Sequence, residues 1–366
     1  MKTRHSHRLM LGLFKRDGTA LGQVPVAADW EPAVEAARLC AHRQLGLAAI
    51  GADAIVEFRP VWQTKLGEPY LSAVDAVLAV PQAGEVSCRV PTAYFKSLAT
   101  AASVPLVSDG RLQAGESFEY MVMAFPDESP APPAPQARFA LEEVPVPLTL
   151  KPSALAGFLS RSTACGENET QDIHVFIPQA ILAEADLLTR QSPAIEVASV
   201  LIGHLHRDAT EGEIFLEVTA QIPARNSQGT SLKVTLGPET YEAVQSAIAL
   251  RGRGEQWLGW FHSHPASAWC NPQCSPEARA QCPLQRVFFS ADDCDVHRTL
   301  FPKAHSIALL FTNTDAGLLH ALFSWRNGLI VQRGFHVLDG DQTPQPAAPI
   351  AAATIGDNEN EKPCSH

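Results

Sequence analysis

WLGWFHSHP, residues 257–265, is the stretch from which both the fold and the chemistry of this chain are inferred. Residues 257–261 form an apolar, aromatic run and predict a β-strand, which Pro265 ends because proline cannot donate a ladder hydrogen bond. Side chains two residues apart in a strand point to the same face. His262 and His264 therefore present two imidazoles side by side, where one cation can accept both. Two histidines at a strand end are often bystanders, so a third ligand is required.

The third ligand is expected downstream, in VFFSADDCD, residues 287–295. The apolar run ends at Ser290, and a loop or helix start after it would turn Asp293 back toward the strand ends. His262, His264 and Asp293 then supply three ligands and leave the fourth position of a tetrahedral zinc to water, as a catalytic site requires. Asp292 and Asp295 are rival carboxylates. Each of the three acids is alternatively a solvated loop residue or a helix cap.

A general base is also needed, because a carboxylate near a zinc-bound water can take its proton and pass it to the leaving amine. Glu196 opens the strongly apolar segment EVASVLIG. A carboxylate at the edge of such a segment is costly unless it has a partner or a role. The alternative is an ordinary surface glutamate at the start of an element.

Together these residues resemble the motif of the JAMM/MPN⁺ (JAB domain) zinc metallopeptidases, in which a Glu is followed by H-x-H-P and then by S-x-x-D. The chain has Glu196, then HSHP at 262–265 and SADD at 290–293, in that order. The flanking segments 174–188, 214–226 and 305–335 are similar to the family's opening strand and helix, its next strand and its closing hairpin. The resemblance covers roughly residues 172–336.

The resemblance implies an α/β domain with a curved, mostly antiparallel sheet flanked by helices. It implies that His262, His264 and Asp293 bind a catalytic Zn²⁺, that Glu196 deprotonates the zinc water, and that Ser290 donates a hydrogen bond to the oxyanion. Relatives cleave peptide or isopeptide bonds at the C-terminus of ubiquitin or ubiquitin-like proteins. The expected substrate is therefore a ubiquitin-like protein or its conjugate, with an activating and conjugating enzyme system as further partners. The alternatives are a non-catalytic scaffold of the same fold and a hydrolase of small amide conjugates.

One departure from the family is the spacing between the Pro and the Ser of the motif: 24 residues, 266–289, lie there where the family usually has about seven, an insertion of about 17 residues. It lies beside the expected metal, where it would shape a substrate groove or cover the site. It also carries three cysteines, and a fourth follows Asp293; four thiolates could bind a second, structural zinc, with His297 as a possible substitute ligand. The alternatives are free or buried cysteines and a redox-sensitive cluster. The four cysteines are Cys270, Cys274, Cys282 and Cys294.

The remaining sequence sets the domain organisation. We expect a mixed α/β domain at 1–126, with strands at 8–14, 73–80 and 118–125 and a helix at 30–45. A Pro-rich connector at 127–171 follows, then the metallopeptidase domain at 172–336 and a disordered tail at 337–366. The other histidines are expected to be solvated or ordinary structural residues: His5, His7, His42, His204 and His206 at the surface, and His305 and His320 in strands.

Charge and hydropathy narrow the class of protein. The net charge of −11 argues against nucleic-acid binding, which favours a basic face. The sequence has no apolar run of the roughly 20 residues that cross a bilayer. The N-terminus has an apolar patch too short for a signal sequence. We therefore expect a cytoplasmic protein that binds neither nucleic acid nor membrane.

Overall fold

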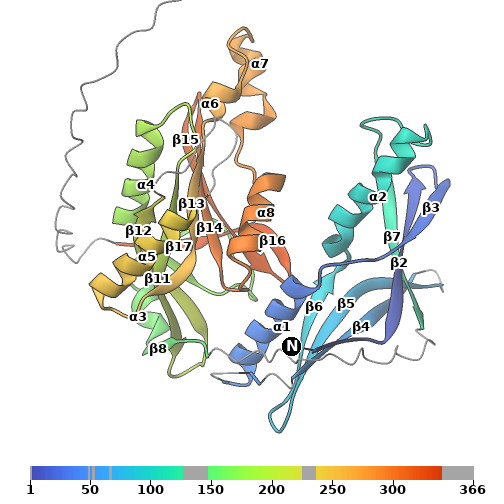
Figure 1. Cartoon of the computed structure of the whole chain (residues 1–366), viewed down its shortest axis with the longest axis horizontal. Helices are drawn as coiled ribbons and strands as arrows, with labels where there is room; N and C mark the ends of the chain where they lie inside the picture. Colours follow the sequence, from blue (N-terminus) through green and yellow to red (C-terminus); the bar gives the residue numbers. More distant parts are fainter. Residues whose placement is uncertain are drawn as a thin grey trace, which may run out of the picture.

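The computed structural model describes residues 2–47, 50–51, 54–65, 68–126, 147–224 and 236–339. The stretch 127–146 of the expected connector and residues 340–366 of the expected tail lie outside the described residues. Figure 1 shows two domains side by side, with α1 (Glu31–Gln44) facing the C-terminal domain.

The N-terminal domain builds one hydrophobic core from two sheets and two helices. The four-stranded sheet has the order β1 (Lys2–His5), β4 (Ile55–Lys65), β5 (Glu68–Val80) and β6 (Gly84–Pro91). The three-stranded sheet has the order β3 (Ala20–Pro25), β2 (His7–Lys15) and β7 (Phe118–Pro126). A short 3₁₀ helix, η1 (Thr92–Phe95), leads into α2 (Lys96–Ser108). The three strands and the helix predicted for this domain are confirmed.

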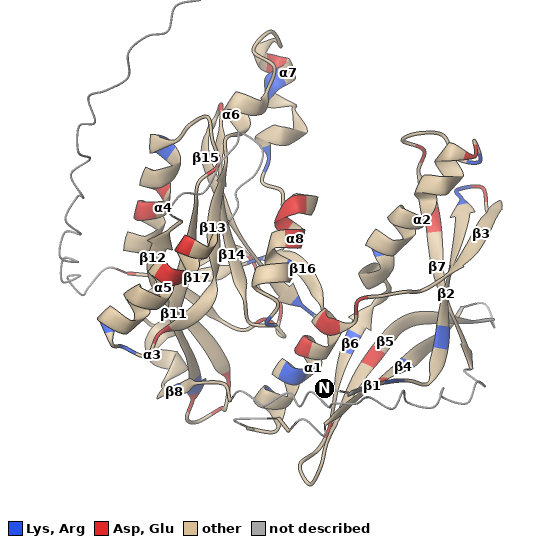
Figure 2. Cartoon of the chain, in the orientation of Figure 1, with Lys and Arg blue, Asp and Glu red and all other residues tan. Residues whose placement is uncertain are grey.

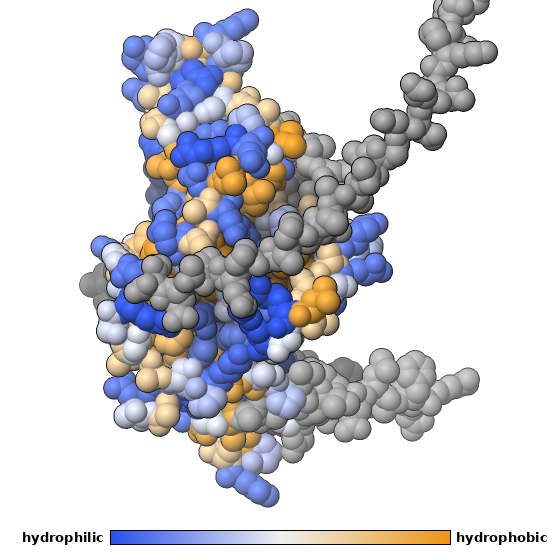
Figure 3. All heavy atoms as spheres, turned by 90° about the vertical axis from the view of Figure 1, so that its left-hand side faces the viewer, coloured by the Kyte–Doolittle hydropathy of each residue, from blue (hydrophilic) through white to orange (hydrophobic). Residues whose placement is uncertain are grey.

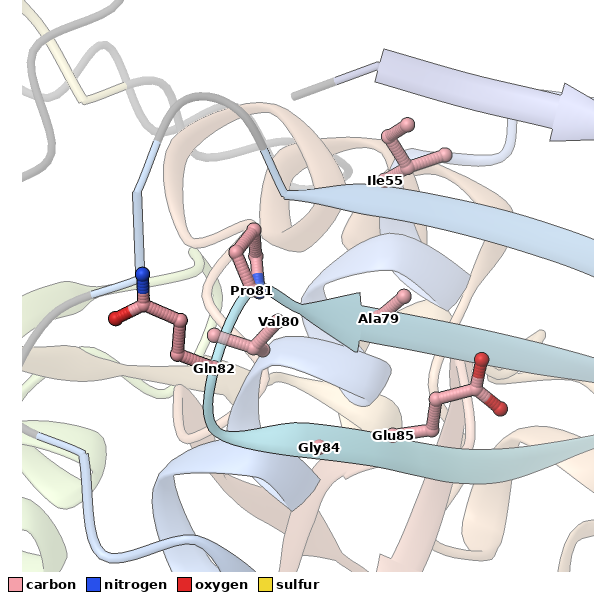
Figure 4. Close-up of a pocket in the computed structure, with 7 residues that line it drawn as sticks. All are labelled: Ile55, Ala79, Val80, Pro81, Gln82, Gly84 and Glu85. Carbon is pink, nitrogen blue, oxygen red and sulfur yellow. The ribbon is translucent and has the colours of Figure 1, made fainter.

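One histidine of this domain differs from expectation. His42 is buried rather than solvated. Its Nδ1 lies 2.7 Å from the carbonyl oxygen of Leu47, just after α1. An open pocket of 330 Å³ at the β5–β6 turn (Figure 4) contains none of the candidate site residues. It is lined by Ile55, Ala79, Val80, Pro81, Gln82, Gly84 and Glu85.

The C-terminal domain is built on a ten-stranded sheet in which antiparallel pairs are the majority, so the predicted fold class is confirmed. Its order is β16 (Leu329–Arg333), β15 (Gly317–Arg326), β14 (Ile307–Thr314), β13 (Gln256–His264), β11 (Ala198–Asp208), β12 (Ile214–Pro223), β10 (Val175–Pro178), β17 (Phe335–Leu338) and β9 (Ser162–Cys165). β8 (Leu150–Ser153) pairs with β11 in parallel. The helices are α3 (Leu155–Leu159), α4 (Gln179–Gln191), α5 (Pro238–Arg251) and α8 (Ala291–Leu300).

β8 and β9 fall within residues that we expected to be connector, so the sheet begins upstream of residue 172. β17 likewise extends into the first residues of the expected tail.

Alternate residues of β11 enter two different hydrophobic cores. Leu201 and Leu205 lie in one, and Val200 and Ile202 lie in the other. A strand that is buried on both faces needs apolar side chains at consecutive positions, which explains the apolar residues at 200–202. β13, its neighbour, is buried in the same way along residues 258–264.

The two domains are in direct contact through α1. Leu39 packs against a core of the C-terminal domain, and the Arg43 guanidinium lies 2.8 Å from the Glu213 carboxylate. Arg207 donates a hydrogen bond of 2.7 Å to the His42 carbonyl. The N-terminal domain is therefore packed against the C-terminal domain rather than joined to it by the connector alone.

Candidate metal centre

His262 and His264 lie at the end of β13, in the middle of the sheet. β13 pairs with β11 on one side and with β14, in parallel, on the other. As the strand period requires, both imidazoles project from one face. The strand continues through His264, and both rings are buried.

Asp293 reaches the same place because β13 and β14 are parallel neighbours, and parallel strands need a crossover connection between them. The chain between β13 and β14 includes α8, which returns to the end of β13. Ser290 is the N-cap of this helix and Asp293 its third residue. The Ser290 Oγ accepts from the Asp293 backbone N–H at 3.1 Å, and the Asp293 Oδ2 accepts from the Ser290 N–H at 2.7 Å. This reciprocal capping box fixes the carboxylate toward the histidines.

The three side chains converge on one point. The Nε2 atoms of His262 and His264 are 3.3 Å apart, and each lies 3.2 Å from an oxygen of Asp293. Ligand atoms about 2.0–2.1 Å from a tetrahedral zinc are about 3.3 Å from one another. Among the residues that the structure describes, this is the only group of three or more such side chains with ligand atoms within 4.8 Å of one another. The donor set and its spacing fit Zn²⁺.

The electrostatics favour the protonation states that a metal requires. Burial lowers the pKa of His262, although the neighbouring Asp293 acts in the opposite direction, and the net shift favours the neutral imidazole. Burial acts to raise the pKa of Asp293, but the adjacent His262 and His264 outweigh it and hold the pKa well below its ordinary range. A neutral imidazole and an ionised carboxylate are the forms that bind zinc.

Glu196 lies beside this cluster. The Ser263 N–H donates to the Val197 carbonyl at 2.9 Å, and the Val197 N–H donates to the Ser263 hydroxyl at 3.1 Å. This pairing places the preceding residue, Glu196, at the His264 end of β13. Its side chain is 5% exposed, so it is not an ordinary surface glutamate. Asp292 and Asp295, the rival carboxylates, are exposed on α8.

The insertion folds beside the site as α6 (Ala266–Trp269), α7 (Pro276–Ala280) and η2 (Pro283–Gln285). Trp269 and Phe288 pack against the His264 ring, with ring centroids 4.9 and 5.0 Å away. The insertion therefore forms a wall of the metal site.

Arg279 holds the insertion together, a role that no sequence pattern indicated. Its guanidinium makes two hydrogen bonds of 2.7 Å to the Asp315 carboxylate in the β14–β15 turn. It also donates to the backbone carbonyls of Ser267, Cys270 and Asn271. One side chain thus ties both ends of α6 to the sheet.

The cysteine cluster is only partly brought together. Cys270 and Cys282 form a side-chain contact, and the Cys270 sulfur accepts a hydrogen bond from Gln285. Cys274 is exposed, and Cys294 lies on α8. The four do not form a group of ligand atoms within 4.8 Å in the described part of the chain. The prediction of a structural zinc there rests on the sequence alone.

His204 and His206 form a second H-x-H sequence, and the prediction that they lie at the surface is wrong. β11 continues past Gly203 to Asp208 and carries His204 and His206 into the interior. The Lys151 ammonium lies 2.8 Å from His204 Nε2, and the Ser153 hydroxyl lies 2.8 Å from His206 Nδ1. These contacts join β8 to β11, and no sequence signal at 204–206 indicated a partner 53 residues away. His320 lies on β15, as expected, whereas His305 is buried in the turn before β14 rather than in a strand.

The surface of the domain is mixed in character. Acidic side chains lie on α4, α5 and α8 (Figure 2), in keeping with the negative net charge. On the side of the molecule where α4 and α5 lie in Figure 1, hydrophobic residues occur in separate small groups among hydrophilic ones (Figure 3). Within the described ranges, none of the helices has the length and apolar character needed to traverse a bilayer.

Comparison with known proteins relates this part of the chain to a known domain family. Residues 170–286 match the family model described as JAB1/Mov34/MPN/PAD-1 ubiquitin protease, which includes Glu196, His262 and His264 and ends before Ser290. Deubiquitinase MYSM1 of Mus musculus is 36% identical over 86 residues, which are 24% of this chain and 10% of that protein. The chain thus matches about a tenth of the length of this curated relative.

A solved structure, that of protein DSY2949 from Desulfitobacterium hafniense, is 18% identical, with 43% of this chain and 89% of that chain covered and a TM-score of 0.28. The family match and the buried His-His-Asp set lie in one domain. The C-terminal region of this chain therefore contains a JAB/MPN domain.

Proposed function

We propose that this chain is a zinc-dependent isopeptidase that cleaves a ubiquitin-like protein from its conjugate or precursor. The observation that carries the proposal is the convergence of His262, His264 and Asp293 at 3.2–3.3 Å from one another in a buried site. An MPN domain that serves only as a scaffold has no need to keep three ligands in this arrangement. An uncompensated set of buried polar groups is costly.

Zn²⁺ bound by these residues would act as a Lewis acid and lower the pKa of a bound water. Glu196, at the His264 end of β13, would serve as the general base that takes a proton and passes it to the leaving amine. Ser290 is suited to donate to the developing oxyanion. Its Oγ accepts from the Asp293 N–H, so the hydroxyl proton is left for another acceptor. The capping box holds the ligand and the oxyanion donor on the same turn of α8.

The substrate class is proposed from the family and from the matched relative, which is a protein named as a deubiquitinase. The wall formed by Trp269 and Phe288 next to His264 is apolar and would contact the residues of an extended peptide on that side of the metal.

The test is cleavage of a linear fusion of a ubiquitin-like protein to a reporter, with zinc content measured in parallel. Glu196→Gln keeps the size of the side chain and removes the base. We expect cleavage to fall by at least 10²-fold while about one zinc per chain remains bound. Glu184→Gln, which alters an exposed acid on α4 of the same domain, is the matched control and should cleave as the native chain does.

Cleavage that persists in Glu196→Gln would remove this residue from the mechanism. A native chain that binds the fusion without cleaving it would instead support the scaffold function. Cleavage of a short peptide amide but not of the fusion would point to the hydrolase of small conjugates.

A further inference from the structure

The two metal-binding histidines lack the usual support. A zinc-ligating imidazole normally donates its second ring N–H to a carboxylate, a carbonyl or a water, which fixes the ring orientation. The Nδ1 atoms of His262 and His264 are buried and have no hydrogen-bond partner among the described residues. Another contact must therefore set the planes of these rings.

For His262 that contact is Trp260, two residues earlier on the same face of β13. The indole and imidazole planes are stacked, with centroids 4.2 Å apart and an angle of 10° between the planes. A stacked ring can still rotate within its plane or slide, so the indole must itself be fixed. Its Nε1–H donates a hydrogen bond of 3.1 Å to the Nδ1 of His297.

His297 acts as an acceptor in this bond. An indole N–H is a donor only, so the Nδ1 of His297 carries a lone pair and the ring proton is on Nε2. The ring is fully buried, with Phe301 and Trp325 as aromatic neighbours. Burial and the nearby His262 lower the pKa of His297 to about 3, so the neutral acceptor form is kept at physiological pH. An aromatic side chain would fill the same space without accepting a hydrogen bond.

The Trp260–His297 hydrogen bond connects the two elements that carry the metal-site residues, because of where His297 lies. It lies one helical turn after Asp293 on α8, and both side chains are buried. The Trp260–His297 hydrogen bond thus joins the strand that supplies two ligands to the helix that supplies the third.

We propose that Trp260 and His297 are positioning residues of the metal centre, and that their hydrogen bond sets the ring plane of His262 and the distance from β13 to Asp293. This inference rests on the proposed metal binding. Neither residue touches the metal, and both act through the ligands that they hold.

The test measures the dissociation constant for zinc by competition with a chromophoric chelator, and the visible spectrum of the Co²⁺-substituted protein. Trp260→Phe keeps a stacked ring but removes the N–H, and His297→Phe removes the acceptor. We expect each to weaken zinc binding about 10- to 100-fold, the usual effect of losing an outer-shell partner, and to change the Co²⁺ spectrum. His297→Asn offers a carbonyl oxygen near the position of Nδ1 and should restore most of the affinity.

Trp257→Phe is the matched control. Trp257 lies on the same strand, and its indole N–H has no hydrogen-bond partner among the described residues, so the same substitution should leave zinc affinity unchanged.

A purely structural pair would give a different result. Thermal stability of the metal-free protein would fall in Trp260→Phe and His297→Phe, while zinc affinity and the Co²⁺ spectrum stayed within twofold of native. That outcome overturns the inference and leaves the proposed function intact. A native chain that binds no zinc overturns both.

Discussion

Gly259→Ala should separate the strand that carries the metal ligands from its neighbour. Gly259 pairs with Ile307 of β14, three residues before His262. A Cβ on Gly259 would lie 1.8 Å from the Ile307 carbonyl oxygen and 2.7 Å from its carbonyl carbon. Both are backbone atoms, so no side-chain rotation can relieve the contact.

The size of the effect follows from the displacement that is needed. A real Cβ essentially never approaches another heavy atom closer than 3.0 Å, so the strands must move apart by about 1.2 Å. Gly259 also pairs with Leu201 of β11, so β13 cannot shift away without disturbing its other neighbour. Overpacking of a buried site typically costs 1–3 kcal/mol. We expect a cost at the upper end of this range, because the clash is with backbone atoms and β13 is paired on both sides. We expect the free energy of unfolding to fall by about 3 kcal/mol, a large part of the roughly 5–15 kcal/mol of an ordinary domain.

The assay is guanidinium unfolding followed by tryptophan fluorescence, with zinc affinity measured on the folded variant. Gly157→Ala is the control, because a Cβ there meets no atom within 4 Å and the backbone has no positive φ. It should change the stability by less than about 1 kcal/mol. A loss of under about 1 kcal/mol in Gly259→Ala, with native zinc affinity, would refute the argument that this strand pairing is too tight for a side chain.

Two further predictions concern α8 and the buried histidines. Ser290→Ala removes an N-cap, which should lower the free energy of unfolding by about 1 kcal/mol in denaturation. It also removes the proposed oxyanion donor, which should slow cleavage about 10²–10³-fold in turnover assays. Ser290→Thr keeps a hydroxyl and should retain most of the stability and most of the cleavage rate. Burial lowers the pKa of His297 to about 3 and that of His305 to about 4, whereas an unfolded histidine titrates near about 6.5. Between these values the unfolded chain binds more protons, so the free energy of unfolding should fall as the pH drops below about 6.5, by up to about 1.4 kcal/mol per pH unit for each histidine. Denaturant titrations from pH 7 to pH 5 check this, and a flat profile in that range would contradict it.

Much of the metal centre was predictable because its parts are local. The two-residue period of a strand puts His262 and His264 on one face wherever the strand lies. The Ser290–Asp293 spacing matches a capping box, which is satisfied within one turn of α8. The order of these pieces along the chain then pointed to the family, and the structure brings them together.

What could not be predicted depends on partners distant in the sequence. Nothing at 204–206 indicated that Lys151 and Ser153 would lie against the two histidines there, because β8 was expected to be connector. The insertion suggested a metal site because it holds cysteines, whereas in the structure the Arg279 guanidinium joins it to Asp315, 36 residues away.

The sequence by itself determined which side chains make up the candidate metal centre and which strand and helix carry them, since short-range periodicity and capping decide these. Only the tertiary structure decided which buried groups support the ligands. The acceptor for the Trp260 indole is a histidine 37 residues later, and it is chosen by the packing of α8 on β13 rather than by any local preference. A hydrogen bond between distant elements forms only when the packing of the whole core brings donor and acceptor within reach. The spacing of the two residues in the sequence does not predict that packing.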